Sequence, residues 1–245
     1  LTMAGLEVDE ILSIDEDHII DIDLTPNRAD CLSVKGVARE LTSINEKYKY
    51  KISKKNKNLD TTCELLEFKF NIIEKNICPR YGLMYLKNIK PHFDMPKYIE
   101  KRLNDIGINS INPFVDILNY IMIDIGQPMH AYDADKIKGE ISVRFAKKNE
   151  SFKALDGNEY KLTEDNVVVA DSNGVISLAG IIGSQHCSIT KETKNIIVES
   201  AFFQPSAMAN KARKLKLQTE SSQRFERGVD YNLPKKAFIE LQSII

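Results

Sequence analysis

Several features that mark common classes of protein are missing from this sequence of 245 residues. It lacks the excess of positive charge that coats a nucleic-acid-binding surface, because its formal net charge is −1. Any contact with RNA would therefore have to be local. The longest apolar runs are broken by polar residues and are too short to span a bilayer, and no signal peptide is recognisable. We therefore expect no membrane partner.

Cysteine is scarce, and its four occurrences form no C-x-x-C pair. They are Cys31, Cys63, Cys78 and Cys187. This scatter predicts neither a zinc site nor a disulfide framework, and it fits a reducing cytoplasm. The G-x-x-x-x-G-K-[ST] phosphate loop and the dinucleotide-binding fingerprint are also missing, so neither motif supports a nucleotide cofactor. We expect a cytoplasmic protein whose present segment holds no metal and no cofactor.

The composition that is present belongs to a folded globular protein, with 42% hydrophobic and 28% charged residues. The length suffices for one large domain or two smaller ones. The chain begins at Leu1 without a methionine and ends on "FIELQSII", and we interpret it as a piece of a longer protein.

The residue pattern divides the chain into four parts. Residues 1–46 are expected to form a small α/β unit, with a strand at "HIIDIDL" and a helix after Leu32. Residues 47–61 are rich in lysine and are interpreted as a basic linker. Residues 62–232 are expected to form the main domain, and residues 233–245 to open a further helical region.

Strands outnumber helices in the main domain. Helices are predicted over residues 95–108, 112–126 and 205–217. Strands are predicted at "ELLEFKF", "RYGLMYLKNI", "EISVRFA", "ESFKAL", "NEYKLT", "NVVVAD", "VISLAG" and "NIIVESAFF". Turn residues typical of hairpins, such as Asp156-Gly157, separate several of these strands. The predicted fold class is α+β with a mainly antiparallel sheet.

A histidine follows a bend at the end of the predicted helix 112–126. In "GQPMHAYD", Pro128 restrains the backbone, so the position of His130 is directed by its neighbours. Asn119 is a second polar residue in this region. His130 either caps a turn or belongs to a functional site, and the local pattern leaves both interpretations open.

Two further segments place unusual residues at apolar strands. Gly180 and Gly183 follow a predicted strand, where glycine either serves a tight turn or lets a ligand approach the backbone. Glu199 lies inside "IIVESAFF", and burying an unpaired carboxylate there is costly. Glu199 is therefore held for a purpose, exposed at an edge, or paired with Arg224 or Arg227 in a structural ion pair.

Six segments, taken in order, resemble one known family. They are "LTMAGLEVDE", "DIDLTPNRADCLSVKGVARE", "LNYIMIDIGQPMHAYD", "LAGIIGSQH", "VESAFF" and "SSQRFERGVD". Together they resemble the N-terminal half of the β subunit of bacterial phenylalanyl-tRNA synthetase, over nearly the whole chain. The resemblance implies an (αβ)₂ ligase that joins phenylalanine to tRNA(Phe) with ATP and Mg²⁺. It places the synthetic site on the α-subunit partner.

The resemblance further implies that residues 62–232 are an editing domain, which hydrolyses tyrosine wrongly attached to tRNA(Phe). Glu199 matches the glutamate that accepts a hydrogen bond from the tyrosine hydroxyl, and His130 matches a histidine near the ester. Thr219 matches a threonine of the pocket wall and completes the catalytic group. The residues implied in substrate binding are Asn119, Gly180, Gly183, Glu199 and Ser221.

Three departures from the family pattern keep an alternative open. Leu118 stands where a threonine is common, and Ser221 stands where alanine is usual. About fifteen residues separate "LTMAGLEVD" from "TPNRADCLS", where the family usually has an OB-fold of roughly a hundred residues. We expect that tRNA-binding insertion to be absent. The alternative to an editing enzyme is a scaffold region with an inert cleft.

Overall fold

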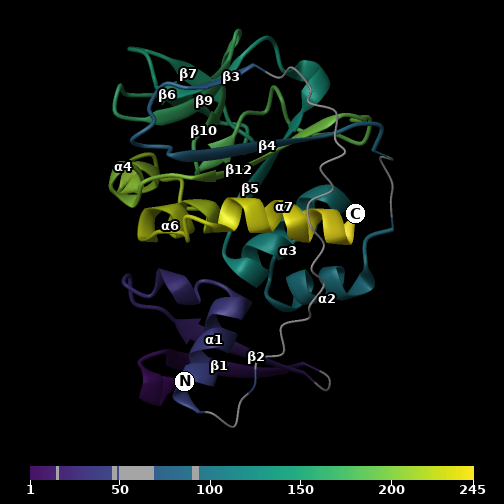
Figure 1. The fold of residues 1–245 in the computed structure, drawn as a ribbon, viewed down its shortest axis with the longest axis vertical. Helices are drawn as coiled ribbons and strands as arrows, with labels where there is room; N and C mark the ends of the chain where they lie inside the picture. Colours follow the sequence, from purple (N-terminus) through teal and green to yellow (C-terminus); the bar gives the residue numbers. More distant parts are fainter. Residues whose placement is uncertain (15–16, 46–48, 50–68, 90–93) are drawn as a thin grey trace.

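The computed structural model shows an α+β fold, as the sequence predicts. It describes residues 1–14, 17–45, 49, 69–89 and 94–245. Figure 1 shows a small N-terminal unit, a layer of helices beside it, and the sheets of the larger region beyond that layer. Most of the predicted linker and most of the predicted strand "ELLEFKF" lie outside the described residues. Within the described ranges, no helix is long and apolar enough to cross a membrane.

The N-terminal unit is a hairpin followed by a helix. Strands β1 (Glu7–Ile14) and β2 (Asp17–Asp23) pair antiparallel. Helix α1 (Val34–Ile44) begins where the Ser33 hydroxyl accepts a hydrogen bond from the N–H of Gly36. The sequence predicts β2 and α1 but not β1, whose apolar residues do not alternate with a period of two. Two short 3₁₀ helices complete the unit: η1 (Thr2–Ala4) and η2 (Ala29–Cys31).

The larger region is built on short strands. They are β3 (Phe70–Ile72), β4 (Arg80–Leu86), β5 (Met129–Asp133), β6 (Ile141–Phe145), β7 (Ser151–Lys153), β8 (Glu159–Lys161), β9 (Val167–Asp171), β10 (Gly174–Leu178), β11 (Ile182–Gly183) and β12 (Ile196–Phe202). One sheet places β12 between β4 and β5, and a second has the order β11-β10-β9-β6-β3. Strands β7 and β8 form a separate hairpin. The pairing is antiparallel except between β3 and β6, which confirms the predicted sheet type.

The helices pack against the three-stranded sheet and around its edges (Figure 1). They are α2 (Lys97–Asp105), α3 (Pro113–Ile125), α4 (Pro205–Met208), α5 (Lys211–Lys214), α6 (Glu220–Arg227), α7 (Leu233–Ile244) and the short η3 (Ala134–Lys136). Helix α3 begins at Asn112, whose side chain caps the first turn, and ends at Gly126 with a φ of 85°. Glycine adopts this left-handed conformation without strain, so α3 stops there and the chain turns into β5.

Helix α7 belongs to the body of the larger region. Ala237, Phe238 and Leu241 are buried in the same apolar core as residues of α2 and α3. The ring of Phe238 lies so close to Gly82 of β4 that a Cβ at that position would come within 2.7 Å of its Cε2 atom. Residues 233–245, which the sequence pattern separates from 62–232, therefore share a core with them.

The predicted helix 205–217 is interrupted in the structure. Asn210 adopts a left-handed φ of 61°, and this residue divides the segment into the one-turn helices α4 and α5. Helix α6, which the sequence pattern did not predict, follows them. It begins at Thr219, whose hydroxyl accepts from the N–H of Ser222 while the Ser222 hydroxyl accepts from the N–H of Thr219.

Ion pairs and hydrogen bonds from arginine side chains to backbone carbonyls join the N-terminal unit to the helical layer. The Lys35 ammonium lies 2.8 Å from a carboxylate oxygen of Asp124 on α3 and 2.9 Å from one of Glu240 on α7. Arg224 donates to the backbone carbonyl of Leu32, and Arg227 donates to that of Leu24. Both arginines of α6 therefore serve this junction, and the expected alternative of an ion pair between Glu199 and either arginine is wrong.

Candidate functional site

A cavity of about 490 Å³ opens between the three-stranded sheet, the end of β10, helix α3 and the start of α6. The structure brings every predicted site residue to its wall. These residues are Asn119, His130, Gly180, Gly183, Glu199, Thr219 and Ser221. They come from segments separated by up to a hundred positions, so the fold rather than the local sequence assembles them.

Glu199 lies in the centre of β12, the middle strand of its sheet, opposite Leu83 of β4 and His130 of β5. Only 6% of the residue is exposed, so the carboxylate is held inside the sheet and not at an edge. Its Oε2 atom accepts hydrogen bonds from the phenols of Tyr81, at 2.7 Å, and Tyr132, at 2.6 Å. No hydrogen bond from the described residues reaches its Oε1 atom. One oxygen of a buried carboxylate on the cavity wall thus remains able to accept.

Burial and hydrogen bonding act on the charge of Glu199 in opposite directions. Removal from water penalises the carboxylate and raises the pKa of Glu199, while the two phenol hydrogen bonds lower it and offset part of this rise. The pKa values of Tyr81 and Tyr132 lie well above 10, because both phenols are buried beside the acid. Both phenols therefore remain protonated and act as donors.

His130 is part of strand β5, so the interpretation of His130 as a turn cap is wrong. Its ring packs edge-on against that of Tyr132, with centroids 4.7 Å apart and an interplanar angle of 77°. Burial lowers the pKa of His130 to about 4, so the imidazole is neutral at pH 7. None of the described residues hydrogen-bonds to its nitrogens. A neutral imidazole on the cavity wall can hold a water molecule or a substrate hydroxyl.

The two glycines make room for side chains of the protein itself. A Cβ at Gly183 would lie 2.3 Å from Nε2 of His130, and one at Gly180 would lie 2.8 Å from Cδ2 of Phe225. Gly180 also has a φ of +66°, which disfavours a side chain. Both residues line the cavity, but their first role is to let His130 and Phe225 pack against this loop.

The hydroxyls at the start of α6 are bound to backbone. Thr219 Oγ1 donates to the carbonyl of Ile181 at 3.0 Å, and Ser221 Oγ donates to that of Gly180 at 3.1 Å. These bonds fix α6 to the glycine-containing loop and so shape the cavity. Thr219 and Ser221 lie on the cavity wall, and the contacts they make are structural.

Helix α3 supplies the opposite wall. Asn119 is half-buried there, and its side-chain amide has no hydrogen-bond partner within the part of the chain that the structure describes. Leu118 also lines the cavity while its side chain packs in the core beneath α3. Asn119 is therefore a polar group of this wall that can bind a ligand.

Tyr81, Tyr132 and Ser177 are the functional candidates that the sequence pattern missed. Ser177 Oγ lies 3.0 Å from Tyr132 Oη, which continues the polar chain from Glu199 toward β10. The alternation of side chains along β5 would have placed Tyr132 on the same face as His130, had β5 been recognised as a strand. Tyr81 carried no such signal, because nothing in the sequence shows that β4 pairs with β12.

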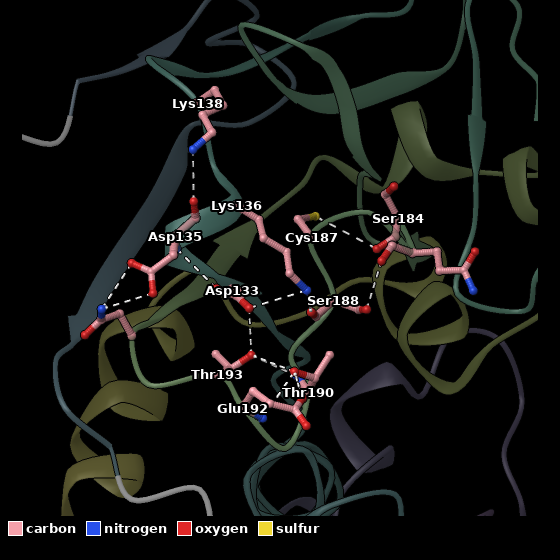
Figure 2. A network of polar contacts seen from close by, with 12 residues as sticks. Asp133, Asp135, Lys136, Lys138, Ser184, Cys187, Ser188, Thr190, Glu192 and Thr193 are labelled. Atoms are coloured by element: carbon pink, nitrogen blue, oxygen red, sulfur yellow. Dashed lines mark hydrogen bonds and ion pairs between the residues drawn. The ribbon is translucent and has the colours of Figure 1, made fainter.

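A polar network joins the end of β5 to the segment 184–195 (Figure 2). Asp133 is buried at the end of β5 and accepts from the Thr193 hydroxyl at 2.7 Å, while its carboxylate lies 3.4 Å from the Lys136 ammonium. Lys136 in turn donates to the backbone carbonyl of Ser188 at 3.0 Å. Ser188 and its neighbour Ile189 line the cavity. The network therefore holds the segment 184–195 against the sheet.

One group of possible metal ligands occurs among the described residues, and it lies away from the cavity. Asp30, Cys31 and Glu40 place their ligand atoms within 4.8 Å of one another. The Arg28 guanidinium already contacts all three, at 3.1 Å from Asp30, 3.0 Å from Cys31 and 2.9 Å from Glu40. The arginine supplies the positive charge that a metal would bring, so this group is an ion-pair cluster.

The sequence is similar to a known domain family and to named relatives. The B3/4 domain family matches residues 77–245. Two relatives named phenylalanine–tRNA ligase beta subunit are similar over nearly the whole chain: the Francisella tularensis protein is 44% identical over 96% of it, and the Haemophilus influenzae protein 42% over 95%. The chain spans 29% of the length of each. Among solved structures, an N-terminal fragment of the phenylalanyl-tRNA synthetase beta subunit from Pyrococcus horikoshii is 22% identical, covers 82% of this chain and 60% of its own, and has a TM-score of 0.42.

Proposed function

Because the chain belongs to the family of phenylalanine–tRNA ligase β subunits, we propose that its cavity hydrolyses tyrosine wrongly esterified to tRNA(Phe). The observation that carries this proposal is the buried carboxylate of Glu199, whose Oε1 atom has no partner among the described residues. Such an acceptor is matched by the phenolic O–H of tyrosine and by nothing on phenylalanine.

The need for such a site follows from the limits of binding. A pocket shaped for phenylalanine rejects an analogue with one added hydroxyl by only about 10²-fold. The reverse selection is much stronger, because a phenylalanine ring placed against Glu199 would leave Oε1 both desolvated and unpaired. A second site built around Glu199 therefore removes tyrosine and leaves the correct amino acid in place.

Hydrolysis at this site depends on positioned water. With a pKa of about 4, His130 is a weak general base, and its neutral imidazole is better suited to orient water or the terminal ribose hydroxyl by hydrogen bonds. The Asn119 amide on the opposite wall can bind the amino acid or the ester. Holding ester and water in reactive geometry supplies much of the acceleration without a covalent enzyme intermediate.

The activity of the whole ligase extends beyond this chain. An α subunit would carry the aminoacylation site in a cytoplasmic heterotetramer of two α and two β subunits, and that site would use ATP and Mg²⁺. This segment would contribute to binding tRNA(Phe). Its one described cluster of metal-ligand type is already paired with Arg28, so the proposed hydrolysis uses no metal held by this segment.

A second candidate is a scaffold region with an inert cleft. Thr219 and Ser221 donate their hydroxyls to backbone carbonyls and so act as structural residues, which favours this alternative. The buried acceptor on Glu199 favours the enzyme, as does the amide of Asn119, which has no hydrogen-bond partner among the described residues.

A deacylation assay separates the two candidates. Tyrosyl-tRNA(Phe) is incubated with the assembled ligase carrying the natural β subunit, Glu199→Gln or His130→Ala. We expect Glu199→Gln to lower kcat/KM for tyrosine release by about 10- to 100-fold, since it weakens a charge-assisted hydrogen bond in the pocket. Glu159→Gln is the matched control, because Glu159 accepts a hydroxyl hydrogen bond from Ser151 at the exposed β7–β8 hairpin. If all the proteins release tyrosine at the uncatalysed rate while the ligase still charges phenylalanine, the scaffold candidate is correct.

A further inference from the structure

We infer that Tyr81 and Tyr132 are the specificity-determining positioning residues of this cavity: by binding one oxygen of Glu199, they present the other oxygen to the substrate. This inference rests on the proposed function. It gives Tyr81 and Tyr132, which the proposed function does not mention, the role of orienting Glu199. It treats the pair of phenols as part of the tyrosine-recognition device rather than as packing of the sheet.

The two phenols approach Glu199 from opposite directions along β12. Tyr81 on β4 pairs with Ala201, and Tyr132 on β5 pairs with Ile197, so each is two positions away from Glu199 and on a different flanking strand. Side chains in such diagonal positions of neighbouring strands are within reach of one another. Both phenols donate to the same Oε2 atom, at 2.7 and 2.6 Å. Two donors on one oxygen fix the rotation of the carboxyl group.

A directed chain of hydrogen bonds holds this arrangement. Each phenol has a single proton, and Tyr132 gives its proton to Glu199, so Ser177 is the donor in the bond of 3.0 Å between Ser177 Oγ and Tyr132 Oη. Tyr132 and Ser177 are buried, with 0% and 5% exposure. Little of either side chain is open to solvent, so the chain keeps this direction.

The Oε1 atom of Glu199, which none of the described residues pairs, is the reason that the cavity would favour tyrosine over phenylalanine. If the carboxylate could rotate freely, both of its oxygens could turn toward water and accept hydrogen bonds when phenylalanine is bound. Binding phenylalanine would then cost little free energy. With Oε2 fixed by two phenols, Oε1 faces the cavity and must be paired by the ligand. Tyrosine pairs it, and phenylalanine leaves it orphaned.

The test measures binding separately from hydrolysis. The assembled ligase is prepared with Tyr132→Phe, Tyr81→Phe and the double variant. Tyr160→Phe is the matched control, since Tyr160 also donates to a carboxylate, that of Asp156 at 2.6 Å, on the exposed hairpin. Calorimetry then gives the Kd of each protein for adenosine carrying tyrosine or phenylalanine through a non-hydrolysable 3′ amide. The ratio of the two Kd values is compared with kcat/KM for tyrosyl-tRNA(Phe) release.

We expect each single variant to reduce the tyrosine-over-phenylalanine binding ratio by about tenfold and the double variant to reduce it further, with Tyr160→Phe unchanged. The reduction should arise from weaker tyrosine binding and stronger phenylalanine binding, a pattern that simple misfolding would not produce. A double variant that keeps the natural ratio overturns the inference, even if the natural protein hydrolyses the ester. If the natural protein binds the tyrosine compound more tightly than the phenylalanine compound but does not hydrolyse tyrosyl-tRNA(Phe), the proposed function is refuted. The inference about Tyr81 and Tyr132 then still stands.

Discussion

The contact between Gly183 and His130 yields the most direct test of the cavity geometry. A methyl group at Gly183 would lie 2.3 Å from Nε2 and 2.4 Å from Cε1 of His130, where ordinary contact begins at 3.4 Å. Gly183 is not among the residues with positive φ, so Gly183→Ala acts through space and not through backbone strain. Leu155 Cδ1 would lie 3.2 Å from the same methyl group, so the methyl group cannot shift toward Leu155 without a second close contact. The imidazole must therefore move by about 1 Å, a displacement that can cost on the order of 10²-fold in rate.

The free energy of unfolding tests the same contact between Gly183 and His130 in a second way. Forcing the methyl group into this packed site should cost about 1–3 kcal/mol in the free energy of unfolding. In a His130→Ala background the space is open, and the same substitution should cost little. Urea denaturation of the natural protein, both single variants and the double variant should therefore give an interaction energy of about 1–2 kcal/mol. An equal cost of Gly183→Ala in both backgrounds would refute the assignment of the imidazole to this space.

Two further predictions concern charge. His130 has a pKa near 4 in the fold and about 6.5 when unfolded, so its neutral form contributes stability that is fully present above pH 6.5 and is lost as pH falls toward 4. His130→Gln should remove up to about 3 kcal/mol of this dependence, measured as the difference in unfolding free energy between pH 7 and 4.5; an unchanged slope would contradict the burial of the imidazole. Asp133→Asn should cost about 1–3 kcal/mol and speed amide hydrogen exchange in the segment 184–195, because the Thr193 hydroxyl and the Lys136 ammonium lose a charged acceptor. Asp230→Asn, which changes an exposed carboxylate that accepts from the N–H of Asn232 and does not contact this segment, should leave that exchange unaltered.

Local signals predicted much of the fold. Asn112 and Gly126 bracket helix α3 because one caps its start and the other adopts the left-handed conformation that ends it. The alternation of apolar residues marked strand β6, and short apolar runs rich in valine and isoleucine marked β9 and β12. Strand β5 was not predicted, because its five residues follow a proline bend and continue directly from the apolar helix α3. The break at Asn210 also escaped, since a left-handed asparagine leaves helical spacing on both sides intact.

The structure brings the predicted site residues to one cavity, but the sequence did not predict the contacts that hold them. The resemblance of short motifs identified Glu199, His130 and the glycines, and the structure brings them to one cavity. Sequence reasoning offered Arg224 and Arg227 as partners of Glu199, whereas two tyrosines hold it. Partner choice across a sheet depends on strand order and register, and neither is encoded by the residues around Glu199 alone.

The electrostatics of the cavity bear on the choice between enzyme and scaffold. A carboxylate buried in the middle of a sheet costs stability, and well-packed apolar residues of similar size often stabilise a fold more than such charged groups do. A scaffold would gain from replacing Glu199 and its phenols by hydrocarbon. Here the acid is buried and bound on one oxygen, and it lies opposite a neutral imidazole in the sheet. None of the described residues hydrogen-bonds to the other oxygen or to the nitrogens of that imidazole. An arrangement that lowers stability and leaves a directed acceptor open is explained by a ligand that completes it, and under the proposed function that ligand group is the phenolic hydroxyl of tyrosine.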